Sequence, residues 1–180
     1  QALGRFDYTP KDCYHFHEAI EKQIVPILKE QADKRSELLG IPELKPWDME
    51  VNASGKPALK PFKDGQDLIN KSIDCFNAIN PQLGQMLSIM KANNLFDVES
   101  RKGKAPGAYN YPLAETGAPF IFMNSANSLR DLTTMVHEGG HAVHTFLTAN
   151  LELNDFKHCP SEVAELASMS MELISMDNWD

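Results

Sequence analysis

The sequence has few cysteines, no long apolar run and a shortage of positive charge. Its three cysteines, Cys13, Cys75 and Cys159, are an odd and scattered set in 180 residues, which favours a reducing compartment over a disulfide scaffold and predicts a cytoplasmic location. No apolar stretch approaches the ~18 residues that a membrane-spanning helix needs. The 17 basic residues are outnumbered by 25 acidic ones, and the net charge of −8 argues against nucleic acid and an anionic membrane as partners.

What is present predicts a mainly α-helical fold with a short β-strand element, built as one domain over residues 1–180. Apolar spacing and start signals predict a long helix from Thr9 to Gly40, kinked at Pro26, a helix over 67–80 and another from Pro81. Phe120–Asn124, an aromatic and β-branched run, predicts a strand that could pair with an extended peptide. The basic, glycine-containing stretch 101–110 is interpreted as a solvated loop.

The run His137-Glu138-Gly139-Gly140-His141 has the HExxH pattern of zinc hydrolases. A helix repeats every ~3.6 residues, so His137 and His141 lie one turn apart on one face and can reach a single metal ion. Glu138 is offset by about a third of a turn, which suits it to hold a water on that metal. The alternative is a pair of satisfied surface histidines with no metal.

The surrounding residues favour the metal site. Ser128 and Asp131 have the spacing of a capping box, and apolar residues follow at helical intervals. Gly139 and Gly140 each cost about 1 kcal/mol in a helix interior relative to alanine. Close approach of another backbone or of a substrate would justify two such residues in succession.

A second helix, predicted over 161–174, offers three candidates for the third ligand, Glu162, Glu165 and Glu172. A metzincin would need glycine at position 144 and histidine at 147, whereas this chain has His144 and Leu147. Glu165 and Glu172 are two turns apart on one face, so one could bind the metal while the other orients a ligand imidazole. His144 is expected to pack near the site without being a ligand.

The runs HEGGHAVH and SEVAELAS resemble the M3 family of zinc peptidases, most closely its oligoendopeptidase F branch. The segments Gly107–Tyr109, Pro119–Asn124 and Leu39–Asp48 extend the resemblance over nearly the whole chain. The resemblance implies zincin-like active-site helices within a larger, mostly helical peptidase catalytic domain. It implies one Zn²⁺ per chain, held by His137, His141 and Glu165, and oligopeptides as substrates.

Family members are several times longer, and they carry downstream histidine and tyrosine residues that bind substrate and stabilise the oxyanion. The resemblance therefore implies that residues 1–180 are a partial catalytic domain, with little or no peptidase activity by itself and a tendency to self-associate.

The predicted function is zinc-dependent endopeptidase activity on oligopeptides, with Glu138 as general base for a metal-activated water. The alternative is a structural zinc-binding helical domain without catalysis. Structural sites are usually closed by four protein ligands rich in cysteine. Two histidines, one glutamate and a water-holding Glu138 fit that class poorly.

Overall fold

Contacts divide the chain into two compact units, Gln1–Ala58 and Leu59–Asp180. The structure, a computed structural model, describes residues 7–49 and 51–179. Within those ranges no helix has both the length and the apolar character needed to cross a membrane. The prediction of a single domain over 1–180 stays a prediction.

The first unit contains two helices, α1 (Pro10–Gln23) and α2 (Val25–Leu39), and a short 3₁₀ turn, η1 (Pro46–Asp48). The predicted start is confirmed, because Thr9 and Asp12 form a capping box in which the Thr9 amide donates to the Asp12 carboxylate at 2.8 Å. The predicted kink is a break at Ile24, which places Pro26 in the first turn of α2, where a helix needs no amide donor. Gly40 ends α2 in the left-handed conformation, with φ of 66°.

The helices of the second unit begin with α3 (Gly65–Ile79) and α4 (Pro81–Ala92). Asp64 caps α3 by accepting a hydrogen bond from the Asp67 amide at 2.8 Å, and Asn80 caps α4. Further along lie α5 (Leu129–Thr148), η2 (Asn154–Lys157), α6 (Ser161–Ser175) and η3 (Met176–Asn178). The fold is therefore mainly α-helical, as predicted.

A three-stranded sheet completes the unit, formed by β1 (Phe96–Glu99), β2 (Tyr109–Leu113) and β3 (Ala118–Ser125) in the order β1-β3-β2. β3 pairs with β1 in parallel and with β2 in antiparallel fashion. The predicted strand at 120–124 is confirmed as the middle of β3. The other two strands were not predicted.

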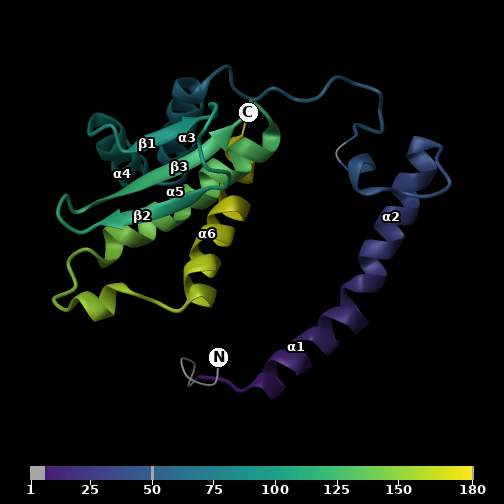
Figure 1. Ribbon diagram of the computed structural model, residues 1–180, viewed down its shortest axis with the longest axis horizontal. Helices are drawn as coiled ribbons and strands as arrows, with labels where there is room; N and C mark the ends of the chain where they lie inside the picture. Colours follow the sequence, from purple (N-terminus) through teal and green to yellow (C-terminus); the bar gives the residue numbers. More distant parts are fainter. Residues whose placement is uncertain (1–6, 50, 180) are drawn as a thin grey trace. The chain divides into compact units, whose positions relative to one another are not determined.

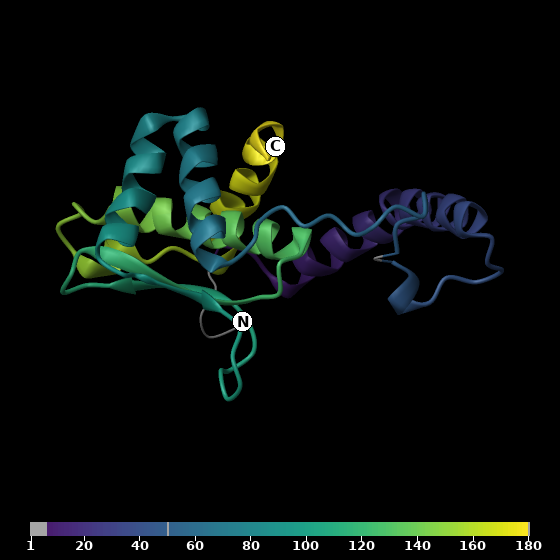
Figure 2. The same cartoon turned by 90° about the horizontal axis from the view of Figure 1, so that it is seen from above.

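Helix α5 lies at the centre of the second unit. It runs along one face of the sheet, and the α3–α4 hairpin and α6 stand on the same side of the sheet (Figures 1 and 2). The core between these layers includes Phe76 from α3, Leu87 from α4, Ile121 from β3 and Val136 from α5, all fully buried. Packing on several sides fixes α5 between the sheet and α6, which positions the HExxH residues.

Candidate metal centre

The two glycines of the HExxH run let neighbouring elements approach α5 closely. A Cβ on Gly140 would lie 2.8 Å from Ser168 Cα and 3.2 Å from the Ala167 carbonyl oxygen, so only glycine lets the α6 backbone pass at this distance. A Cβ on Gly139 would lie 2.7 Å from the ring of Phe76 on α3. The predicted reason for paired glycines, close approach of another backbone, is confirmed at Gly140.

The close approach of α5 and α6 brings three ligand-type side chains together. The Glu165 Oε2 atom lies 3.2 Å from His137 Nε2 and 3.8 Å from His141 Nε2. One ligand atom from each of the three residues lies within 4.8 Å of the others, a spacing at which a single metal ion could be held. Glu162, the first of the three candidate glutamates, is not in this group.

Two polar side chains on α6 orient this group. Glu172 Oε1 lies 2.6 Å from His137 Nδ1. An ionised carboxylate only accepts, so this contact suits a hydrogen on Nδ1 and leaves Nε2 as the nitrogen that could bind a metal. Ser168, which is buried, donates its hydroxyl to Glu165 Oε2 at 3.2 Å. Glu172 thus occupies the orienting position that its two-turn spacing from Glu165 allowed, whereas Ser168 was not predicted.

The protonation of the neighbouring groups follows from burial. Glu138 is 6% exposed, and burial raises the pKa of its carboxyl, while His137 and a hydrogen bond from the Asn110 backbone amide act in the opposite direction. Burial, and secondarily His137, lowers the pKa of His141. His141 is therefore favoured as a neutral imidazole with a free lone pair, the form that binds metals.

Cavities flank the three side chains on both sides along α5. One, of about 260 Å³, contains His141 and also His144, which lies near the site without joining the ligand group, as predicted. The other, of about 300 Å³, is lined by His137, Glu138 and Glu172. The group of His137, His141 and Glu165 therefore has open space next to it in both directions along α5.

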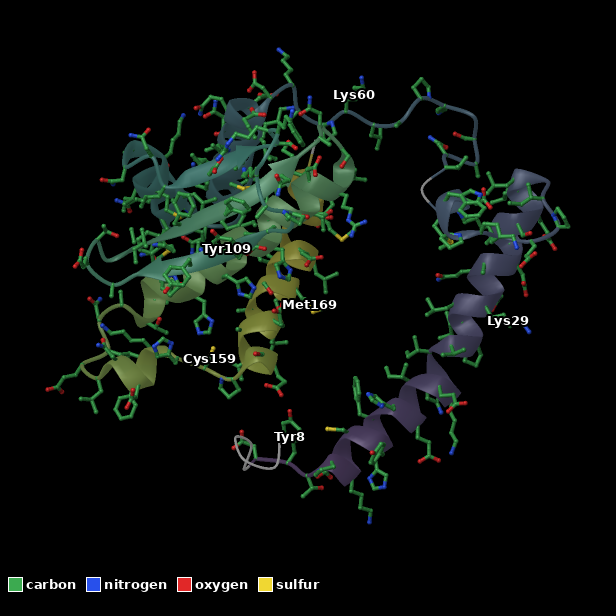
Figure 3. All side chains as sticks on the ribbon, in the orientation of Figure 1. Tyr8, Lys29, Lys60, Tyr109, Cys159 and Met169 are labelled. Atoms are coloured by element: carbon green, nitrogen blue, oxygen red, sulfur yellow. The ribbon has the colours of Figure 1, made fainter. Side chains whose placement is uncertain are left out.

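Strand β2 contributes Asn110 to the lining of the cavity beside His141. The side chain of Asn110 accepts a hydrogen bond from Thr145 of α5 at 3.4 Å, and its backbone amide reaches Glu138. Figure 3 shows Tyr109 at the start of β2 and Met169 on α6. The alternating aromatic residues of 109–111 could have indicated a strand, but the glycines and lysines before them favoured a loop.

Two predictions about this region were wrong. The peptide-pairing strand cannot be β3, because β3 lies between β1 and β2 and is paired on both sides. Residues 101–110 are not simply a solvated loop, because Tyr109 and Asn110 belong to β2 and the Lys104 side chain is 1% exposed. Sequence periodicity could not reveal either point, since strand order and burial of a loop lysine depend on contacts distant in the sequence.

Comparison with known proteins gives one consistent result. The profile described as "Peptidase family M3" matches residues 1–180. An oligoendopeptidase F homolog of Lactococcus lactis subsp. lactis (strain IL1403) is 28% identical over 97% of this chain, which covers 28% of that protein. An oligopeptidase of Bacillus subtilis (strain 168), named PepF, is 27% identical over 92% of this chain and is covered to 24%. This chain thus spans less than a third of the length of these relatives.

Solved structures agree in fold over nearly the whole chain. The structure titled "PZ peptidase A with inhibitor 2" superposes with a TM-score of 0.91 at 30% identity, over 98% of this chain and 31% of that one. A putative oligoendopeptidase F from Bacillus anthracis str. Ames gives a TM-score of 0.89 at 26% identity, over 97% of this chain and 32% of that one.

Proposed function

The chain belongs to peptidase family M3, and on that premise we propose that it carries the zinc centre of an endopeptidase that hydrolyses oligopeptides. The observation that supports this most is the convergence of His137, His141 and Glu165 beside the buried carboxyl of Glu138. The relatives' names, oligoendopeptidase and oligopeptidase, give the substrate class.

The donor set fits zinc. Two imidazole nitrogens and one carboxylate oxygen, with further space beside them, match the three protein ligands and open position of catalytic zinc sites. His137 Nε2, His141 Nε2 and the Glu165 carboxylate would hold the ion, and Glu172 and Ser168 would keep two of these ligands oriented. When bound, zinc supplies a Lewis acid that activates water and polarises a peptide carbonyl.

Glu138 acts as the general base in this proposal. It is next to the first ligand in the chain, on the same helix, and its burial raises its pKa above the usual range of a glutamate. A carboxyl with a raised pKa takes a proton from attacking water more readily and still returns it to the departing amine.

The peptide would bind along β2. Among the described strands, β2 is the edge strand next to α5, so one side of its backbone is available for pairing with an extended peptide. Such pairing reads the peptide backbone and leaves the side chains for the flanking cavities. This geometry suits the cleavage of peptides with little demand on their sequence.

The test replaces Glu138 by glutamine in the full-length protein, because residues 1–180 alone are expected to have little activity, and it follows both zinc content and hydrolysis of a quenched fluorescent oligopeptide. We expect Glu138→Gln to keep about one zinc per chain and to lose roughly 10²–10⁴-fold in kcat, the usual contribution of a general base. Glu152→Gln, an exposed site near the end of α5, is the matched control and should keep the parent rate. Near-parent hydrolysis by Glu138→Gln would exclude Glu138 as the base. An inactive parent that holds zinc would favour the structural zinc domain instead.

A further inference from the structure

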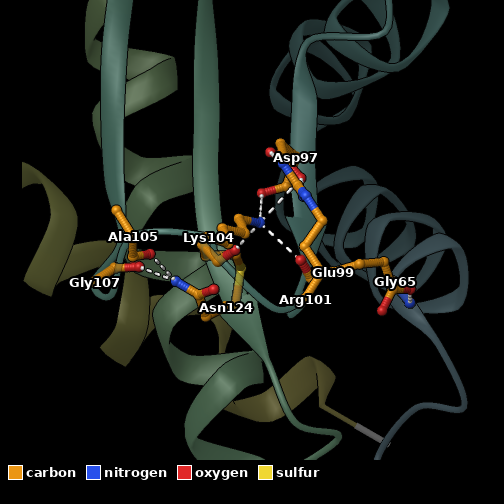
Figure 4. Close-up of polar contacts among 9 residues, drawn as sticks. Gly65, Asp97, Glu99, Arg101, Lys104, Ala105, Gly107 and Asn124 are labelled. Carbon is orange, nitrogen blue, oxygen red and sulfur yellow. Dashed lines mark hydrogen bonds and ion pairs between the residues drawn. The ribbon is translucent and has the colours of Figure 1, made fainter.

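Lys104, in the connection between β1 and β2, carries a buried positive charge. Its side chain is 1% exposed. The Nζ atom donates to the carbonyl oxygens of Asp97 at 2.9 Å, Glu99 at 2.8 Å and Met123 at 2.5 Å, and it lies 3.0 Å from the Asp97 carboxylate (Figure 4). Removing an ammonium from water is costly unless it is paired and hydrogen-bonded, so this side chain is held firmly.

The ammonium lies at an irregularity in the sheet. Asp97 pairs with Phe122 and Glu99 with Ser125, so Val98 of β1 stands opposite two residues of β3, Met123 and Asn124. A bulge of this kind interrupts the ladder of hydrogen bonds. At this bulge, the Lys104 ammonium donates to the Met123 carbonyl of β3 and to the carbonyls of Asp97 and Glu99 in β1, so it links the two strands.

The same interval holds the segment that leads into β2. Asn124 donates its side-chain amide to the carbonyls of Ala105 at 2.8 Å and Gly107 at 3.1 Å (Figure 4). Lys104 Nζ also lies 4.4 Å from the centre of the Phe122 ring, which stacks on Tyr109, the first residue of β2, with 4.9 Å between ring centres. The place where β2 begins is therefore fixed by contacts around Lys104.

The next residue of β2 is Asn110, whose side-chain oxygen accepts a hydrogen bond from Thr145 of α5 at 3.4 Å. We propose that Lys104 is a positioning residue that sets β2 against α5 and so places Asn110 against Thr145 and the edge of β2 beside the group of His137, His141 and Glu165. The expected effect of Lys104 on peptide hydrolysis rests on the proposed function. Its expected effect on the position of β2 does not depend on that function.

The experiment compares Lys104→Met with Lys102→Met in the zinc-loaded, full-length protein. Methionine keeps most of the length and apolar volume but removes the ammonium, and Lys102 is an exposed lysine in the same connection. For Lys104→Met we expect faster amide hydrogen exchange over 109–113 with unchanged exchange over 137–141. We expect kcat/KM for an oligopeptide to fall about tenfold or more, because small misplacements near reacting groups are costly. Zinc content and the affinity for acetohydroxamate, a ligand for the metal itself, should not change.

Lys102→Met should leave all of these quantities at parent values. Unchanged exchange over 109–113 in a folded Lys104→Met protein would overturn the proposal, as would unchanged kcat/KM in an active parent. If the parent does not hydrolyse peptides, the proposed function fails and the exchange measurement alone decides the role of Lys104. If Lys104→Met does not fold, Asn124→Ala, which removes the two contacts to Ala105 and Gly107, takes its place. It should show the same changes in smaller degree, and unchanged exchange over 109–113 would then overturn the proposal.

Discussion

The group of His137, His141 and Glu165 and the cluster around Lys104 are both polar assemblies in the second unit, and they are built in opposite ways. In the first, the imidazoles are 23% and 19% exposed and the carboxylate is 51% exposed, with Glu165 Oε2 3.2 Å from His137 Nε2 and 3.8 Å from His141 Nε2. In the second, a cation that is 1% exposed is surrounded by carbonyl and carboxylate oxygens.

The difference lies in where the positive charge comes from. Around Lys104 the chain supplies the cation itself, so the acceptors are satisfied and the cluster can be closed to solvent. Between α5 and α6 the chain brings together a carboxylate and two imidazole nitrogens, and an imidazole is positive only when it is protonated, so the positive charge there comes from protons or from a bound cation. Partial exposure gives an ion and a substrate access to that place. A satisfied cluster stabilises the fold, whereas an unsatisfied, accessible one is suited to binding and chemistry.

The largest expected effect on the more exposed group comes from removing one of its proposed metal ligands. In Glu165→Ala we expect the zinc content of purified protein to fall well below one per chain, a larger loss than the 10–100-fold in affinity that an outer partner usually costs. Glu162→Ala, one turn away on α6, is the control and should keep its zinc. Elemental analysis after dialysis measures both. Equal loss in Glu162→Ala, or full zinc in Glu165→Ala, would contradict the ligand assignment.

Removal of an orienting charge should have a smaller effect. Glu172→Gln keeps the size of the side chain that meets His137 Nδ1 at 2.6 Å but removes its charge, so we expect zinc affinity to fall by about 10–100-fold. Competition with a chelating dye measures the affinity. Asp177→Asn, an exposed change in η3, should leave it unaltered. An affinity equal to that of the parent would mean that Glu172 merely packs beside His137.

The grouping of His137, His141 and Glu165 was accessible from the sequence because its determinants are local. Ser128 and Asp131 begin α5 with the predicted capping box, in which the Ser128 amide donates to the Asp131 carboxylate at 2.8 Å. The spacing of His137 and His141 follows from helix geometry, and so does the two-turn spacing of Glu165 and Glu172. Residue spacing alone left Glu162, Glu165 and Glu172 as candidates for the third metal ligand, and the family resemblance was needed to choose Glu165.

The sheet and its buried lysine were not accessible in the same way. β1 and β2 are short, and β2 contains Pro112, which strand patterns disfavour. Pro112 is tolerated because β2 is an edge strand among the described strands. The side chain of Lys104 is 1% exposed, and its ammonium lies beside the bulge opposite Val98. Such features depend on pairing between segments about 20 residues apart, which no local pattern records.

The smallest expected effect concerns Asp97, the carboxylate of the closed cluster. A hydrogen bond from Arg101, with further contributions from Lys104, lowers the pKa of Asp97 from 3.8 to about 2. A carboxyl whose pKa is lower in the folded state stabilises the fold above its unfolded pKa, and this contribution is lost as the pH falls from about 4 through about 2. The side chain is 26% exposed, so solvent screening reduces the contribution to about 1 kcal/mol. In urea unfolding of the metal-free protein, Asp97→Asn should be less stable than the parent by that amount at pH 6, and the difference should vanish towards pH 2. Asp155→Asn, an exposed change in η2, is the control, and its free energy of unfolding should differ from that of the parent by the same amount at every pH. If the difference for Asp97→Asn also does not vary with pH, the charge of Asp97 does not stabilise the cluster around Lys104.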